Sequence, residues 1–226
     1  MPVAAPGRAE LAVLAAGLAL LLGLEATPLD LALARPFFDA AAADFRWREH
    51  WFFTRVSHDA LRWVAGIALV WLLVGIWRPL GVLARLPRSA RLYLFATVAL
   101  ALIAIPLVKR ASFTHCPWDL ALFGGSAGYL RLFDWPQSGA TRGHCLPAGH
   151  AVAGFAFVAG WFAFRPHAPG IARAWLAAAL LFGAWAGLAQ QVRGAHFLSH
   201  TLWTAWLCFA LAMLAAAVVA RMRITR

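Results

Sequence analysis

Charge, and negative charge above all, is scarce in this chain of 226 residues. Only 13% of the residues are charged, nine are acidic, and none of these acids follows Asp134. Lys109 is the single lysine among 20 basic residues, and there are three cysteines. A soluble domain is about half apolar and about 25% charged, whereas 63% of this chain is hydrophobic. The composition excludes an ordinary soluble domain, and any chemistry in the second half has no carboxylate nearby in sequence.

Long uncharged runs occupy most of the chain. A helix needs about 20 mostly apolar residues to cross a bilayer, and the last four of six windows fit this length better than the first two. The windows are Leu11–Leu24, Trp63–Trp77, Leu92–Val108, Gly143–Phe164, Ala174–Val192 and Gly194–Ala220. We therefore predict an all-α fold, a polytopic helical bundle with about six transmembrane helices, in a single integral-membrane domain over residues 1–226. The first window also fits the core of a cleaved signal peptide, with Arg8 as its basic flank.

The net charge of +11 does not indicate nucleic-acid binding, because most arginines flank the apolar windows as membrane anchors do. Six spans place both termini on one side of the membrane. The segments on that side are short and rich in arginine: 78–91, 165–173 and 221–226. The positive-inside rule therefore places the termini in the cytoplasm. The segments 25–62, 109–147 and 193–200 then face outward.

The outer segment 25–62 contains an aromatic stripe. Trp47, Trp51, Phe52 and Val56 fall near one side of a helix, with charged residues around the rest. This pattern predicts a helix lying in the membrane interface or packed on the protein's own outer surface. We interpret His50 and His58 in this segment as surface or packing groups.

Three polar clusters reach the outer face where the apolar windows end or begin. They are "KRASFTHCPWDL" (109–120), "RGHCLPAGH" (142–150) and "RGAHFLSH" (193–200). Ionisable groups at membrane depth are costly to bury and are functional candidates for that reason. Three clusters at one level predict a composite site.

These clusters resemble the motifs of the type 2 phosphatidic acid phosphatase (PAP2) superfamily of membrane phosphatases, KxxxxxxRP, PSGH and SRxxxxxHxxxD. Lys109 precedes "CP" (116–117) at the spacing of the first motif, "PAGH" (147–150) matches the second, and "GAHFLSH" (194–200) matches the end of the third. The resemblance covers about residues 92–215. Four letters depart from the pattern. Cys116 and Gln190 stand at arginine positions, Ala148 at the serine position and His200 at the aspartate position.

The resemblance implies a role for each matching residue. Lys109 binds the substrate phosphate, and Gly149, beside Ala148, offers a backbone N–H at a helix start. His150 acts as general acid, and His196 attacks phosphorus to form a phosphohistidine. The resemblance implies no metal and no other cofactor.

The four departures require substitutes. Arg193 lies one helical turn from Gln190 and can provide a missing phosphate clamp. Arg110 or Arg142 can replace the charge lost at Cys116. The proton of His196 needs an acceptor, which is either His200, four residues later, or the carboxylate of Asp119. Asp119 also suits a helix N-cap.

The cysteines leave three readings open. Cys116 lies in the first cluster and Cys145 in the second, each directly after a histidine. The first reading is a disulfide between them, which an oxidising compartment would allow. They suit a zinc site with His115 and His144, or they remain free thiols. Cys208 lies within the last apolar window and is interpreted as a packing residue.

We predict an integral-membrane phosphatase or phosphotransferase that acts on a lipid-linked phosphate, with its site facing the periplasm from a bacterial inner membrane. Phosphatidate-like lipids, polyprenyl diphosphates and phosphorylated lipid A are all compatible substrates. A catalytically inactive, lipid-binding relative is one alternative. A metal- or haem-binding membrane protein that uses His196 and His200 with His150 is the other.

Overall fold

The computed structural model describes residues 3–135 and 141–222, and within them only one short hairpin is not helical or loop. The helices are α1 (Arg8–Glu25), α2 (Leu29–Ala34), α3 (Leu61–Gly75), α4 (Arg88–Ala111), α5 (Val152–Phe155), α6 (Gly160–Phe164), α7 (Pro169–Val192) and α8 (Leu198–Arg221). A π-helix (Phe52–Ala60) runs directly into α3, and a 3₁₀ segment (Ala156–Ala159) joins α5 to α6. Other 3₁₀ turns cover Arg35–Phe37, Gly81–Arg85, Pro117–Asp119 and Ala121–Phe123. In the antiparallel hairpin, β1 (Phe38–Asp39) pairs with β2 (Asp44–Phe45), and Phe38 lies opposite Phe45.

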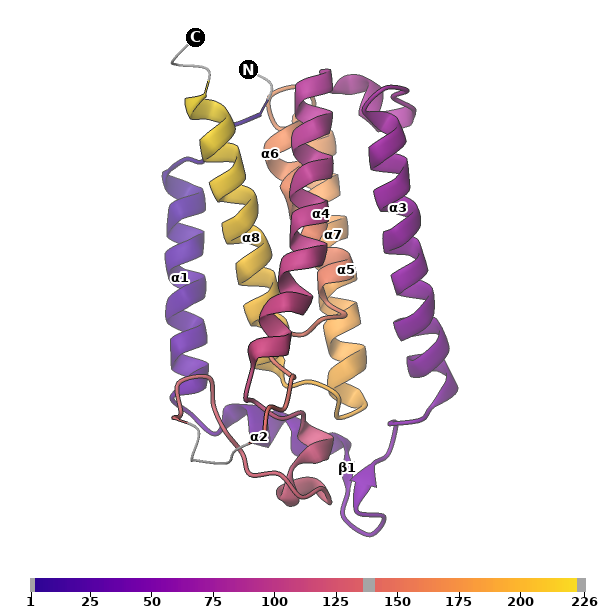
Figure 1. Ribbon diagram of the computed structural model, residues 1–226, viewed down its shortest axis with the longest axis vertical. Coiled ribbons are helices and arrows are strands. Elements are labelled where there is room, and N and C mark those ends of the chain that lie inside the picture. The colour runs from indigo at the N-terminus through magenta and orange to yellow at the C-terminus, as the bar shows by residue number, and fades with distance from the viewer. Residues whose placement is uncertain (1–2, 136–140, 223–226) are drawn as a thin grey trace.

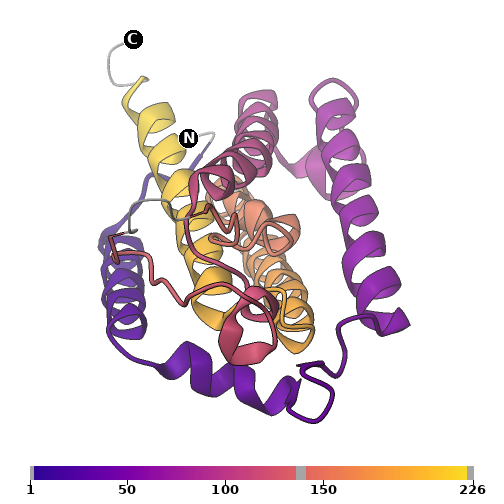
Figure 2. The same cartoon turned by 60° about the horizontal axis from the view of Figure 1, so that its bottom comes forward.

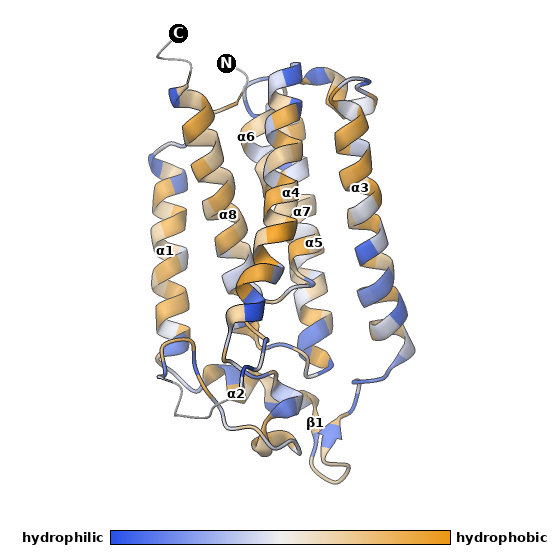
Figure 3. Ribbon diagram, viewed as in Figure 1, coloured by the Kyte–Doolittle hydropathy of each residue, from blue (hydrophilic) through white to orange (hydrophobic). Residues whose placement is uncertain are grey.

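The long helices run side by side along one axis, and α1 begins at the end of the bundle where α8 ends (Figure 1). At the opposite end, α2 and the hairpin lie across the bundle and form a cap with the loops (Figures 1 and 2). Hydrophobic residues dominate the middle of the long helices, and hydrophilic residues gather toward the ends (Figure 3). The fold is therefore the predicted all-α bundle of a multi-pass membrane protein.

The helices differ in whether they are long enough to span a bilayer. Among the described residues, four qualify by length and hydropathy: Phe52–Gly75, α4, α7 and α8. The helix α1 qualifies only together with Leu29–Phe37, across a bend of 83°, which raises the count to five. The fourth predicted window holds the continuous helical segment Val152–Phe164 of 13 residues. Its length of about 20 Å falls short of a hydrocarbon core of about 30 Å.

Burial explains why this central segment is short. Within this segment, Val152, Phe155, Ala159 and Phe162 are at most 5% exposed and belong to the core of the bundle. Because the neighbouring helices surround it, the thickness of the bilayer does not set its length. Close packing against α7 depends on glycine, since a Cβ on Gly154 would lie 2.2 Å from the backbone nitrogen of Gly183.

The interfacial helix predicted around Trp47–Val56 is not present as such. From Phe52 onward the chain forms one helix with α3, along the bundle axis, and Trp47 lies in the preceding turn. The apolar window Trp63–Trp77 alone is too short to span a bilayer, and the added turns of Phe52–Ala60 lengthen it. The helix that lies across the bundle is instead α2, after the bend that follows α1 (Figure 2).

Two acids of α1 cross-link the two halves of the chain. Glu10 accepts a hydrogen bond from Trp161 Nε1 at 3.0 Å, and Glu25 accepts one from Trp203 Nε1 at 3.0 Å. No acid follows Asp134 in the sequence, and these two indole donors pair with carboxylates on the first helix. These contacts fix α1 against the core.

We expect Gly154→Ala to lower the stability of the bundle by about 1–3 kcal/mol, because the added methyl group meets backbone that must shift. Gly66→Ala on α3 is the matched control, since nothing lies within 4 Å of its added Cβ and a helical Gly→Ala change is neutral or stabilising. Thermal unfolding of both purified variants in detergent measures the difference. Equal melting temperatures for the two variants would contradict this account of the α5–α7 contact.

Candidate active site

The three polar clusters meet at the cap end of the bundle. The backbone N–H of Ala148 in the second cluster donates to the carbonyl of His200 in the third, at 3.0 Å. The N–H of Trp118 in the first cluster donates to the carbonyl of Gly194 in the third, also at 3.0 Å. Main-chain hydrogen bonds therefore join clusters that lie far apart in the sequence.

A disulfide joins the first cluster to the second. Cys116 and Cys145 are bonded, with their Cα atoms 5.3 Å apart, within the range that disulfides require. The sequence left a disulfide, a zinc site and free thiols open, and the structure contains the disulfide. Because neither sulfur is a thiolate, the zinc site that would have added His115 and His144 lacks its sulfur ligands. Cys208 is free and buried within α8.

His196 and His200 face each other in the third cluster. Their Nδ1 atoms are 3.4 Å apart, and both side chains are buried. Because this contact needs one donor and one acceptor, the two rings hold complementary tautomers. The Sγ of Cys145 lies 3.3 Å from the same Nδ1 of His196. These contacts occupy Nδ1 and leave Nε2 of His196 as its reactive nitrogen.

The side chain of Lys109 lies beside Gly149, just before the central helical segment begins. It lies in the last turn of α4, and a Cβ on Gly149 would be 3.6 Å from its Cδ and 3.8 Å from its Nζ. Among the described residues, the N–H of Gly149 has no hydrogen-bond acceptor, whereas that of Ala148 is donated to His200. A free N–H beside an ammonium group is suited to an anion.

Burial and nearby charge keep two of the histidines neutral. Burial, together with the charges of neighbouring groups that include Lys109, lowers the pKa of His150 to about 3. Burial and the charge of Lys109 also lower the pKa of His196 well below its usual range. The rings of His150 and His196 are 6.4 Å apart, centroid to centroid. The resting site therefore places neutral imidazoles around one ammonium group.

Arg193 reaches the position of the missing arginine. Its Nη1 donates to Oε1 of Gln190 at 3.2 Å, and its Nε donates to the carbonyl of Arg48 at 2.8 Å. Arg193 as a whole residue is 9% exposed. A guanidinium group has five N–H donors, so donors beyond these two remain available to a ligand.

Three other predicted site residues lie apart from this cluster. Arg110 is exposed at the end of α4, and Arg142 is exposed with its guanidinium 5.3 Å above the ring of Phe113. Asp119 closes a 3₁₀ turn, so it is no helix N-cap, and it lines a polar hollow with Arg48. Among the described residues, its carboxylate makes no hydrogen bond to a site histidine.

Two residues that the sequence did not assign to the site contact it from the first outer segment. The ring of His58 lies on that of His150, with centroids 3.9 Å apart, whereas the interpretation as a surface group holds for exposed His50. Asp30 of α2 is buried and accepts the N–H of Ser199, in the first turn of α8, at 3.0 Å. The pair "HD" at 58–59 places an acid beside an imidazole, a weak signal that does not predict the contact with His150. The sequence around Asp30 carried no comparable signal.

Comparison with protein families gives a match to the PAP2 superfamily over residues 90–224. The chain belongs to the PAP2 superfamily. No curated protein and no solved structure matches the chain. The PAP2 match includes Lys109, the second cluster and the third cluster, but it begins after His58 and Asp30.

The charges around the PAP2 motifs favour an anionic ligand. Lys109 and Arg193 supply positive charge, and among the described residues no carboxylate bonds to His150, His196 or His200. A metal cation would be repelled by the ammonium and guanidinium groups, whereas a phosphate would be attracted.

Proposed function

We propose that this protein is an integral-membrane phosphatase that removes a phosphate from a lipid through a phosphohistidine on His196. The convergence of buried His196 and His200 with half-buried Lys109 and His150 in one cluster carries this proposal. Membership of a superfamily of phosphatases supports the same reaction class. The same site could transfer the phosphoryl group to a second lipid without any additional protein group. The two reactions differ only in the acceptor, which is water in hydrolysis and a lipid hydroxyl group in transfer.

The reaction begins with the Nε2 lone pair of His196 attacking phosphorus. Its Nδ1 proton is held by Nδ1 of His200, which fixes the tautomer as a carboxylate does elsewhere. Lys109, Arg193 and the N–H of Gly149 neutralise the non-bridging oxygens, the principal requirement of phosphoryl transfer. The leaving oxygen takes up a proton as it departs, and the family resemblance assigns His150 as the donor of that proton. Water then attacks the phosphohistidine and releases phosphate.

An apolar hollow beside the site suits a lipid tail. It has a volume of about 230 Å³ between α3, α5 and α7, and its lining includes Val64, Ala65, Gly154, Phe157 and Phe182. Gly154 lies about one turn from His150, so a chain in this hollow has its phosphate end at the site. Phosphatidate-like lipids, polyprenyl diphosphates and phosphorylated lipid A all combine an apolar tail with a phosphate.

The arginine-rich segments favour an orientation with the termini in the cytoplasm. In a bacterial inner membrane, the cap end and its disulfide then face the periplasm, a compartment in which disulfides persist. The substrate phosphate would be on the outer leaflet.

The direct test is phosphate release from a panel of these lipids in detergent, with wild type beside His196→Ala. We expect release from at least one lipid and a loss of several orders of magnitude in the variant, because the nucleophile is removed. Brief reaction with ³²P-labelled substrate should label the wild-type chain with an acid-labile, alkali-stable phosphate. His167→Ala, at an exposed turn before α7, is the control histidine. No release from any lipid would favour the inactive, lipid-binding alternative, and a stoichiometric bound metal or haem would favour the other.

The three candidate arginines should differ in activity. Arg193→Ala is expected to lower kcat/KM by about 10²–10³-fold, the usual cost of losing one donor to a transition-state oxyanion. Arg110→Ala and Arg142→Ala should remain close to wild type, because both side chains are exposed. The melting temperature of Arg193→Ala checks that the lost bond to Arg48 has not unfolded the cap. Full activity in Arg193→Ala would remove it from the phosphate clamp.

Activity should persist at acidic pH. The attacking imidazole must be neutral, and because the pKa of His196 is lowered by burial, the neutral form survives below the usual pKa of 6.5. We expect kcat/KM, corrected for the substrate's own ionisation near pH 6, not to fall between about pH 7 and pH 5. A nucleophile with an ordinary histidine pKa would lose about 25-fold over that range. Such a loss, measured in the pH profile of kcat/KM, would contradict the buried, neutral His196.

A further inference from the structure

A polar hollow in the cap lies beside the phosphate site and has no part in the reaction proposed above. Its volume is about 520 Å³, within the usual range of small-molecule sites. The first outer segment, the first polar cluster and the loop after that cluster form its walls. The lining includes Arg48, His115, Trp118, Asp119, Ser126 and Thr141. Because side chains that form hydrogen bonds dominate this lining, the hollow suits a polar ligand.

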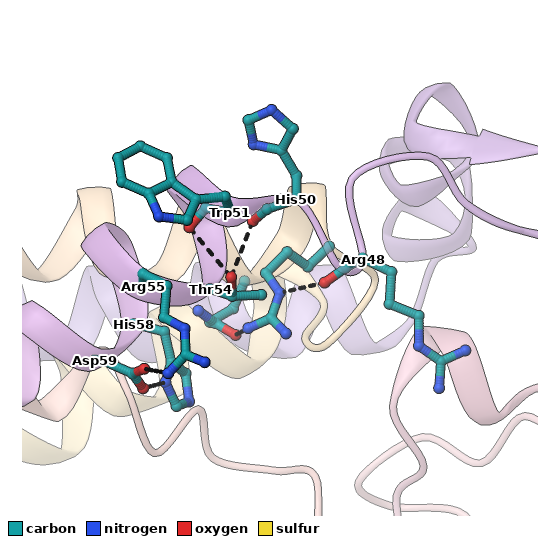
Figure 4. Close-up of polar contacts among 9 residues, drawn as sticks. Arg48, His50, Trp51, Thr54, Arg55, His58 and Asp59 are labelled. Atoms are coloured by element: carbon teal, nitrogen blue, oxygen red, sulfur yellow. Dashed lines mark hydrogen bonds and ion pairs between the residues drawn. The ribbon is translucent and has the colours of Figure 1, made fainter.

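Trp118 belongs both to this hollow and to the surroundings of the proposed phosphate clamp. The guanidinium carbon of Arg48 is 4.9 Å from the centroid of the Trp118 ring, and that of Arg193 is 5.9 Å from it. Nε of Arg193 donates to the main-chain carbonyl of Arg48 at 2.8 Å. The side chain of Arg48 points away from the π-helix that carries His58 and Asp59 (Figure 4). The hollow and the clamp therefore share a wall, so a ligand in one lies next to a ligand in the other.

The loop that forms one wall of the hollow is held by its own main chain. The carbonyl of Asp119 accepts the N–H of Ser126 at 3.0 Å and that of Ala127 at 2.8 Å. The N–H of Ala121 donates to the carbonyl of Ala127 at 2.9 Å. A Cβ on Gly125 would lie 2.2 Å from the carbonyl oxygen of Asp119, so this close approach requires glycine. The wall is therefore formed before a ligand binds, and its shape does not depend on the side chains that face the hollow.

The side chains of the hollow offer both donors and acceptors of hydrogen bonds. Arg48 has N–H donors, Asp119 has acceptor oxygens, and the hydroxyl groups of Ser126 and Thr141 can do both. In the part of the chain that the structure describes, the side chains of Asp119, Ser126 and Thr141 make no hydrogen bond or ion pair. Arg48 is paired with Asp44 at 3.1 Å, and its remaining N–H groups are available.

This mixture of groups favours hydroxyl groups as the ligand. A phosphate dianion offers only acceptors and an ammonium group only donors, so each would use half of the lining. The carboxylate of Asp119 repels an anion, and the guanidinium groups of Arg48 and Arg193 repel a cation. A hydroxyl group donates and accepts without a net charge. A ring that carries several hydroxyl groups therefore matches the whole lining.

We propose that the hollow binds a sugar that carries the scissile phosphate, so that the substrate is a phosphorylated glycolipid. The proposal rests on the phosphatase function proposed above and selects among its lipids. Phosphorylated lipid A has its phosphates on sugars, whereas phosphatidate and polyprenyl diphosphates contain no sugar. As Nε2 of His196 bonds to phosphorus, the bond from phosphorus to the sugar oxygen breaks. The sugar then leaves as an alcohol, with the proton from His150.

Two probes with matched leaving groups test the sugar site. Dodecyl phosphate and dodecyl glucoside 6-phosphate both lose the alkoxide of a primary alcohol, and they differ in the sugar. We expect kcat/KM of the wild type to be at least about 10-fold higher for the glucoside, because several hydrogen bonds are added. Ser126→Ala and Thr141→Ala should each lower this preference about 3- to 10-fold, the usual effect of one lost hydrogen bond. Turnover of dodecyl phosphate should stay at the wild-type level in both.

A filled hollow gives a second test that does not depend on single hydrogen bonds. Ser126 is exposed, so Ser126→Trp places an indole in the hollow without entering the core. We expect this variant to lose the preference for the glucoside and to keep its turnover of dodecyl phosphate. Arg46→Ala, on the exposed surface of the cap outside the hollow, is the control and should keep the preference. Wild-type melting temperatures in all variants check that the cap is folded.

The outcomes separate the sugar site from the phosphatase function. Equal kcat/KM for the two probes in the wild type, or a preference that survives Ser126→Trp, would overturn the sugar site alone. Dodecyl diphosphate is the third probe, and a preference for it that Ser126→Trp abolishes would assign the hollow to a second phosphate and overturn the sugar.

A wild-type chain that releases no phosphate from any probe or lipid would overturn the phosphatase function. Equilibrium binding of labelled dodecyl glucoside 6-phosphate then tests the hollow by itself. Ser126→Trp should weaken this binding about 10-fold or more, because the hydrogen bonds to the sugar are lost. Equal binding by the wild type and Ser126→Trp would overturn the sugar site as well.

Discussion

The site depends on Lys109, whose ammonium group lies among histidines that burial already keeps neutral. Protonation of His150 or His196 would place a second positive charge beside it in a medium of low dielectric, which is unfavourable. The same charge attracts a phosphate dianion, and the dianion offsets it. In the proposed mechanism, one ammonium group therefore keeps the nucleophile neutral before binding and provides the attraction that brings the substrate in. A carboxylate hydrogen-bonded to His196 would favour its protonation and would reduce the attraction for a phosphate in the resting site.

Acids in the first 59 residues supply carboxylates to a site whose second and third polar clusters contain none. Glu25 and Asp30 hold the end of α8 that carries His200, through Trp203 and Ser199. Asp59 holds an imidazole against His150. None of these acids lies at His196 itself, so they order the site without cancelling its positive charge. The segments outside the family match thus contact the candidate active site as well as forming part of the membrane bundle.

The sequence predicted the helices well because long apolar windows leave few alternatives to spanning or buried helices. It also predicted that the three polar clusters would meet, because each lies at the end of a window on one side. It could not predict which helix would be enclosed by the others, so Val152–Phe164 turned out shorter than a span. It also missed His58, because contacts between helices depend on their relative rotation. A π-helix alters that rotation in a way that no local pattern of Phe52–Ala60 reveals.

Two of the departures from the family pattern offset each other in charge. The pattern supplies three cations and one carboxylate, from its lysine, two arginines and aspartate, a net charge of +2. Here Lys109 and Arg193 supply two cations and His200 supplies no negative charge, so the net charge is again +2. Cys116 gives up an arginine's charge but gains a covalent link to Cys145, which holds the first two motifs together. Restoring only the arginine at residue 116 would make the site more positive than the family pattern. Restoring only the aspartate at residue 200 would make it less positive. The paired change preserves the attraction for a phosphate dianion, so the unusual letters are consistent with a working phosphate site.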